Sequence, residues 1–203
     1  MTDYGDGETI TGESFRDAEL PGQAWRGVTF EECDFTEADL HGSTTHGCRF
    51  VRCRFHRADL VSAKHTATAF HNCEFEKALL TRWSLDGCSL VGSTFLECRM
   101  RPITIKDTDL SLVSLTSANL RDATLSGLRF RDANLMETDF REVDLRDADL
   151  SGARLTSTKF DGADLRGAKI DADGLVHAQL RGAKIDLDTA IRYAAAHGLI
   201  VAT

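Results

Sequence analysis

Large apolar residues recur at every fifth position between Phe15 and Ile185, and this spacing constrains the fold more than any other feature of the chain. Counting in fives from 15 to 185 gives 35 positions, of which only Thr45 and His65 are not large and apolar. On an α-helix each fifth residue is rotated by about 140°, and on a strand each fifth residue changes face, so neither element would collect these side chains on one side. The chain is therefore predicted to turn once per repeat.

The other positions of the repeat indicate how the chain turns. A small residue, most often alanine, stands two positions before the large one. Thirteen of the sixteen glycines occupy the position two residues after the large one, counting two glycines that precede Phe15 at the same point of the five-residue repeat. Glycine accepts positive φ at no steric cost, as a tight corner requires. Each repeat is thus predicted to supply a large inward residue, a small inward residue and a corner.

Two segments carry this pattern in its most regular form. Residues 148–152 read Ala-Asp-Leu-Ser-Gly and residues 163–167 read Ala-Asp-Leu-Arg-Gly, and both resemble the motif of the pentapeptide repeat proteins. The resemblance implies an all-β solenoid, a right-handed quadrilateral β-helix with four repeats per coil and the large residue on its axis. We expect a flexible N-terminal lead at 1–11, the pentapeptide-repeat β-helix at 12–185, and a short C-terminal helix and dimerisation tail at 186–203.

Two positions are expected to disturb the rod. Pro102 cannot donate to a β-ladder, so a kink or a changed corner is predicted there. Asp173 places a carboxylate in the small inward phase, which predicts a loosened coil or a short loop.

The C-terminal segment changes period. Asp186 or Asp188 can cap a helix over about Thr189 to His197, and Gly198 is placed to end it. The open end of a β-helix must be covered, either by a simple cap or by a cap that also joins two subunits. We expect a homodimer, because this segment offers more apolar surface than one coil end needs; the predicted interface is Leu187, Ile191, Leu199, Ile200 and Val201.

Composition limits the partners and the compartment. The formal net charge is −8, which argues against direct binding to nucleic acid or to anionic membranes but allows a partner with a basic surface. No basic and apolar leader or membrane-spanning run is visible, and the six cysteines all occupy the small inward phase, so they are expected to be reduced and buried. These features predict a soluble cytoplasmic protein.

No pattern of catalysis is evident. His41, His46, His56 and His71 each follow the axial position of a repeat and are expected to point outward, and no nucleotide-binding, hydrolase or metal-ligand motif is present. We expect no enzymatic activity, no cofactor and no bound metal.

Acidic side chains are the candidate contact residues. With 20 residues per coil, Glu19, Asp39 and Asp59 should stack about 4.8 Å apart. Such a column is either tolerated on a solvent-facing surface or retained for a basic partner. A second acidic region is diluted by arginines; it consists of Glu137, Asp139, Glu142, Asp144, Asp147, Asp149 and Asp164.

Three stretches are similar to one branch of the pentapeptide family, the mycobacterial fluoroquinolone-resistance proteins called MfpA; they lie at 98–102, 148–154 and 194–199. This resemblance implies a homodimer joined through its C-terminal ends that mimics a DNA segment, binds DNA gyrase and inhibits it or protects it from fluoroquinolones. A duplex of about 42 Å would carry roughly 25 charges, so mimicry would depend on local columns of charge and on shape. The alternative is a structural scaffold whose acidic face binds another basic protein.

Overall fold

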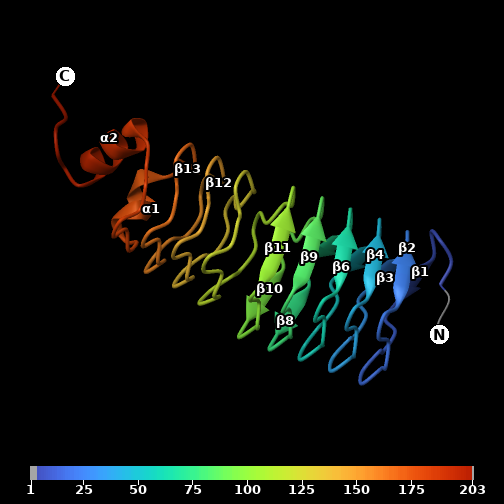
Figure 1. Ribbon diagram of the computed structural model, residues 1–203. Coiled ribbons are helices and arrows are strands. Elements are labelled where there is room, and N and C mark those ends of the chain that lie inside the picture. The colour runs from blue at the N-terminus through green and yellow to red at the C-terminus, as the bar shows by residue number, and fades with distance from the viewer. Residues whose placement is uncertain (1–3, 203) are drawn as a thin grey trace.

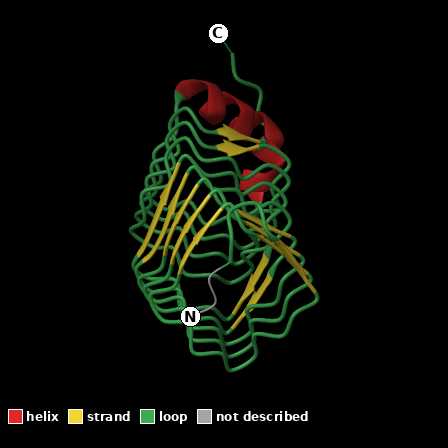
Figure 2. Ribbon diagram, turned by 90° about the vertical axis from the view of Figure 1, so that its right-hand side faces the viewer, coloured by secondary structure: helices red, strands yellow, loops and turns green. Residues whose placement is uncertain are grey.

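The computed structural model describes residues 4–202 and forms a rod of stacked coils, with the N-terminal strands at one end and the helices at the other (Figure 1). Strands pair in parallel with a register of 20 residues, so that Ile10, Phe30, Phe50 and Phe70 follow one another in a single row. Viewed from the side turned by 90°, the coils nest inside one another and share one outline (Figure 2). The predicted quadrilateral β-helix is confirmed.

The regular elements are short because a corner follows each repeat. Two of the sheets have the strand orders β1-β3-β5-β7 and β11-β9-β6-β4-β2, and β8 pairs with β10 and β12 with β13. Beyond β11 the ladder continues mainly as single bridges, such as Ser114 to Asn134. The elements are β1 (Thr9–Thr11), β2 (Ala24–Arg26), β3 (Thr29–Glu31), β4 (Thr44–His46), β5 (Arg49–Val51), β6 (Lys64–Thr66), β7 (Ala69–His71), β8 (Glu74–Glu76), β9 (Trp83–Asp86), β10 (Thr94–Leu96), β11 (Ile103–Lys106), β12 (Asp149–Leu150), β13 (Lys169–Ile170), α1 (Ala172–Val176) and α2 (Leu187–Ala196).

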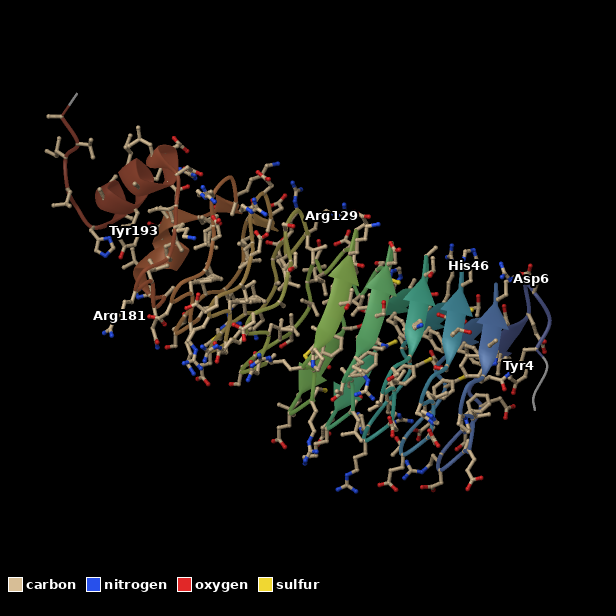
Figure 3. The ribbon with its side chains drawn as sticks, in the orientation of Figure 1. Tyr4, Asp6, His46, Arg129, Arg181 and Tyr193 are labelled. Atoms are coloured by element: carbon tan, nitrogen blue, oxygen red, sulfur yellow. The ribbon has the colours of Figure 1, made fainter. Side chains whose placement is uncertain are left out.

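The N-terminal segment is more ordered than the sequence predicts. β1 pairs with β3 within the stretch expected to be a flexible lead. Tyr4 packs edge-to-face against Phe15 and Phe30, with ring centroids 6.3 and 5.8 Å apart, and covers the first coil (Figure 3). The lead is therefore structured from residue 4 onward, and residues 1–3 lie outside the described part of the chain.

Stacked aromatic rings fill the axis of the first half of the rod. Phe35, Phe55 and Phe75 form one stack with ring centroids 5.0 and 4.8 Å apart and interplanar angles of 3° and 5°. Phe30, Phe50 and Phe70 form a second stack with nearly the same spacing. Because rings in successive coils stack on one another, the period-five pattern builds a continuous aromatic core along this half of the rod.

The two polar residues of the axis contact each other through Nδ1 of His65, whose buried Nε2 has no hydrogen-bond partner among the described residues. Thr45 Oγ1 lies 2.7 Å from His65 Nδ1 and 2.8 Å from Thr68 Oγ1, and all three side chains are buried. Desolvation lowers the pKa of His65 to about 3, so the imidazole is neutral at neutral pH. Thr45 and His65 are thus inside the rod, as their position in the repeat predicts.

The six cysteines are unpaired, and all but the partly exposed Cys98 are buried, as their phase in the repeat predicts. Cys53 Sγ donates to the Phe30 carbonyl and Cys73 Sγ to the Phe50 carbonyl, each one coil earlier. Hydroxyls do the same in this phase, since Thr138 Oγ1 donates to the Leu115 carbonyl. Burial raises the pKa of Cys98 to about 11, so thiolate chemistry is disfavoured even at the most accessible of the six.

The two predicted disturbances differ in kind. At Pro102 the rod continues, because β11 begins at the next residue and pairs with β9 in register. Around Asp173 the structure forms the short helix α1 where a loosened coil or a loop is predicted, and Leu175 on this helix still fills the axis.

α2 closes the C-terminal end. Asp186 caps it, since its side chain accepts a hydrogen bond from the Thr189 amide, and Gly198 follows the helix with φ of 77°. The predicted cap and stop are confirmed. No helix within residues 4–202 is long and apolar enough to cross a bilayer.

Candidate functional site

The column of Glu19, Asp39 and Asp59 has the predicted geometry. Parallel bridges join Glu19 to Asp39 and Asp39 to Asp59, so the three carboxylates project from one face in successive coils. Within the described residues no lysine or arginine pairs with any of them; the exposed His41 imidazole lies 3.5 Å from Asp39. The column is therefore an uncompensated line of negative charge.

Two of these aspartates also hold the corner that follows them. Asp39 Oδ1 accepts a hydrogen bond from the His41 amide at 3.0 Å, and Asp59 Oδ1 accepts one from the Val61 amide at 2.8 Å. This is the Asx-turn geometry that favours Asp or Asn before a turn. The acceptor oxygen serves the fold, whereas the charge does not, because an asparagine would make the same turn.

In the second acidic region, the aspartates that precede large residues are neutralised by arginines. Asp139, Asp144 and Asp164 each receive two hydrogen bonds from the arginine two residues later, at 2.6 to 2.9 Å. Asp149 pairs with Arg131 at 2.6 Å. The hydrogen bonds from Arg146 to Asp144 and from Arg166 to Asp164 lower the pKa of those aspartates, to about 2 for Asp164. These four carboxylates stabilise corners and ion pairs and present little free charge to a partner.

The remaining acids of that region occupy corners. Glu137, Glu142 and Asp147 have φ of 58° to 59°, as does the preceding corner residue Asp132 at 54°. They surround a single coil, one acid at each corner. Glu142 and Asp147 have no ion-pair partner in residues 4–202, and Glu137 accepts a hydrogen bond from Ser117. A partner that touches one face cannot contact all of these corners, so the Glu19 column is the better-placed group.

The rest of the surface offers no reaction centre among the described residues. No group of three His, Cys, Asp or Glu side chains there is arranged to hold a metal ion. A shallow groove of about 340 Å³ over the first coils is lined by residues that mostly pair with one another, such as Arg57 with Glu37 and Arg16 with Asp34.

The predicted dimer residues lie together at the C-terminal end. Leu187 and Ile191 are on α2, with 77% and 41% of their surface exposed, and Leu199, Ile200 and Val201 follow in the tail, with Ile200 96% exposed. The opposite side of α2 holds the buried Thr189 against the rod. α2 thus covers the last coil and still leaves an apolar surface uncovered.

Two exposed leucines were not among the predicted site residues. Leu96 and Leu112 expose 52% and 58% of their surface in the middle of the rod. Leu112 also adopts φ of 60°. A sequence signal was available, because Leu112 stands in the phase that glycine and polar residues usually occupy.

The period-five core, the parallel 20-residue register and the corner geometry together define a quadrilateral β-helix of the kind that pentapeptide repeats build. A protein-family model described as pentapeptide repeats matches the sequence at residues 14–44 and 133–171, in eight copies of the repeat. No curated protein sequence matches the chain significantly.

Solved structures with the same fold are those of QnrB1, described as a plasmid-mediated fluoroquinolone resistance protein. A trypsin-treated variant of QnrB1 is 23% identical, with a TM-score of 0.83 over 97% of this chain and 99% of that one. Full-length QnrB1 is 23% identical, with a TM-score of 0.81 over 94% of this chain and 97% of that one. At this level of identity the similarity establishes the fold.

Proposed function

We propose that this protein is a non-enzymatic, DNA-mimicking inhibitor of DNA gyrase that competes with DNA for a binding surface and can protect the enzyme from fluoroquinolones. The observation that carries the proposal is the uncompensated column of Glu19, Asp39 and Asp59 on a rigid rod. The fluoroquinolone-resistance role described for the similarly folded QnrB1 supports it.

The spacing of the column suits a surface that binds DNA. Neighbouring carboxylates are one coil apart, about 4.8 Å, a spacing of the same order as the 3.4 Å of helix axis per phosphate on one strand of DNA. Like charges stacked in this way repel one another, and the fold would be served equally well by neutral amides. Retention of charge at three successive positions therefore favours a partner with a positive surface.

Neutralising this column tests the proposal. The triple variant Glu19→Gln, Asp39→Asn and Asp59→Asn keeps the turn-forming oxygens and removes three charges. We expect gyrase binding to weaken on the order of tenfold at low salt, with an unchanged or slightly higher Tm because repulsion is relieved. The measurement is titration of labelled protein with purified gyrase.

A matched variant gives the same change of net charge elsewhere. Glu137→Gln, Glu142→Gln and Asp147→Asn neutralise three corner acids and should weaken binding less than twofold if the column makes the contact. If both triple variants lose affinity equally, overall charge rather than the column determines binding. If neither does, the acidic surfaces are not the gyrase contact.

We further propose that the protein acts as a homodimer joined through α2 and the tail. Exposed Leu187, Ile191 and Ile200 provide the apolar surface for this contact. A chain ending at Ile185, and a full-length variant with Ile191→Asp and Ile200→Asp, should both sediment as monomers at concentrations where the native chain is dimeric. If the native chain sediments as a monomer, the proposed dimer is wrong and α2 only covers the C-terminal end of the rod.

The alternative, a scaffold for another basic protein, would be favoured by one outcome. That outcome is normal supercoiling of DNA by gyrase in an excess of the folded protein. The Glu19 column would then bind a basic partner other than gyrase.

A further inference from the structure

One face of the rod changes character along its length. This face is formed by the repeats centred on Phe15, Phe35 and every twentieth residue after them, through Leu175. In its first four coils nearly every outward residue is charged, as in the repeats 53–57 and 73–77. In the coils from residue 94 onward, charged residues become sparse, and the outward side chains are mainly Thr, Ser, Asn, Leu and Met.

A continuous uncharged column runs along this second half. Leu96 and Thr116 lie in adjacent coils and together line a groove of about 300 Å³ whose surface is mainly apolar. Phe95, Cys98 and Met100 form the floor of that groove. The column continues one coil at a time up to α1 and consists of Leu96, Thr116, Met136 and Thr156.

The corner that leads into this face adds a second apolar group. Leu112 stands four residues before Thr116 in the same coil and exposes 58% of its surface. Its positive φ is shared by nineteen other non-glycine residues within residues 4–202 and belongs to the corners of the fold, but exposing a leucine at such a corner does not help to fill the core. An exposed leucine in a left-handed corner is therefore better explained by a contact outside the rod than by folding.

Acidic residues stand on both sides of the column, and one exposed basic residue, Arg154, stands beside Thr156. Glu97 and Glu137 stand next to it at one corner, where Glu97 is 63% exposed and meets Lys77 only at 3.7 Å. Asp132 occupies the same corner as Leu112 in the next coil, and it has no ion-pair partner among the residues that the structure describes. A partner that covers the apolar column would thus bring its own flanking groups against carboxylates.

The spacing of the column fits an α-helix. A helix laid along the rod presents one side chain per 5.4 Å turn, and the coils repeat at about 4.8 Å. Over the three coil spacings from Leu96 to Thr156, about 14 Å, the two periods drift apart by only about 2 Å. A helix of about 14 residues, roughly 21 Å long, spans the column.

We propose that this face is a second interaction surface, and that it binds an amphipathic α-helix of a partner protein whose aliphatic stripe is flanked by lysine or arginine. The surface lies in a different half of the rod from the Glu19 column and does not depend on gyrase binding. Burial of Leu96, Leu112 and Met136 supplies the apolar contact, and Glu97, Asp132 and Glu137 select basic flanks.

Synthetic helices test the proposal directly. The probe is a fluorescent 14-residue peptide with leucine at positions 1, 5, 8 and 12, lysine beside them and alanine elsewhere. One comparison peptide has serine for each leucine, and another has glutamate for each lysine. Fluorescence anisotropy with the full-length protein should show the leucine–lysine peptide binding at least tenfold more tightly than either comparison peptide.

Protein variants locate the binding. Leu96→Ser with Leu112→Ser, and separately Glu97→Gln with Glu137→Gln, should each weaken the leucine–lysine peptide at least fivefold. The control, Glu74→Gln with Glu76→Gln on the charged half of the same face, should change its affinity less than twofold.

Three results would overturn the proposal. Equal binding of the serine–lysine peptide would mean that charge alone attracts the probe. Unchanged affinity in both double variants would place the probe elsewhere. Self-association of the protein that the leucine variant abolishes, with no peptide binding, would make a second copy of this chain the occupant.

Discussion

Replacing Phe55 with alanine is expected to lower the free energy of unfolding by about 3–5 kcal/mol. Phe55 is fully buried and is stacked between Phe35 and Phe75. Its ring also meets Phe50 and Phe70 edge-on, at 5.6 and 6.0 Å between centroids. Truncation therefore removes contacts in three consecutive coils and leaves a cavity that stiff neighbouring coils cannot close. Urea unfolding followed by circular dichroism measures the change.

Leu112→Ala is the matched control, because it removes a large apolar side chain outside the axis. Its effect should stay within about 0.5 kcal/mol. Comparable losses in the two variants would mean that the axis is not where the period-five pattern places it. In a solenoid the loss at Phe55 should also appear first in the neighbouring coils, since each coil contacts only its neighbours.

Acidification is expected to destabilise the rod through His65. The folded-state pKa is about 3 because the imidazole is buried, whereas an unfolded histidine titrates near 6.5. Below pH 6.5 the unfolded chain binds a proton that the folded chain does not. The contribution of neutral His65 is thus complete above pH 6.5 and is lost as pH falls toward 3, at about 1.4 kcal/mol per pH unit, or on the order of 3–5 kcal/mol in total.

His65→Leu isolates this contribution from that of the carboxylates. Leucine fits the axial phase, and Thr45 and Thr68 can still hydrogen-bond to each other. Unfolding free energies of both proteins at pH 7, 5 and 3.5 should therefore diverge, with the native chain losing more stability at each step. A constant difference across this range would mean that His65 is reached by solvent or protonated in the folded state.

Ion-paired aspartates add a common background in both proteins. Arg141 lowers the pKa of Asp139, and Arg146 that of Asp144. Their stabilisation is present at neutral pH and is lost as pH falls through those lowered values. Because this loss is shared, the difference between the native chain and His65→Leu remains a measure of the histidine alone.

The sequence predicts the core of this protein well because every five-residue repeat places its side chains in the same way. A large residue every fifth position must lie on the axis, and the positions of Thr45 and His65 in the register predict their burial even though both are polar. The cap at Asp186 and the stop at Gly198 are equally local features. Such signals depend on neighbours in the chain and need no knowledge of the packed rod.

The features that the sequence did not predict depend on contacts between coils. Tyr4 is ordered by the rings of Phe15 and Phe30, and a polar lead gives no sign of them. α1 forms where the pattern indicates only a disturbance at Asp173. The charge of a carboxylate depends on its neighbours in the same way, since Arg131, 18 residues before Asp149, neutralises it across coils. The sequence therefore suggested two acidic surfaces as partner-binding sites. The ion pairs in the structure leave the Glu19 column as the better candidate for such a site.

The most direct test of the proposed function is DNA supercoiling by purified gyrase titrated with the folded full-length protein. The account predicts inhibition by the native chain, and a dose for half-inhibition that rises about tenfold in the Glu19→Gln, Asp39→Asn, Asp59→Asn variant. Normal supercoiling in a large excess of folded, dimeric protein would contradict gyrase inhibition and leave the rod as a scaffold for a different partner.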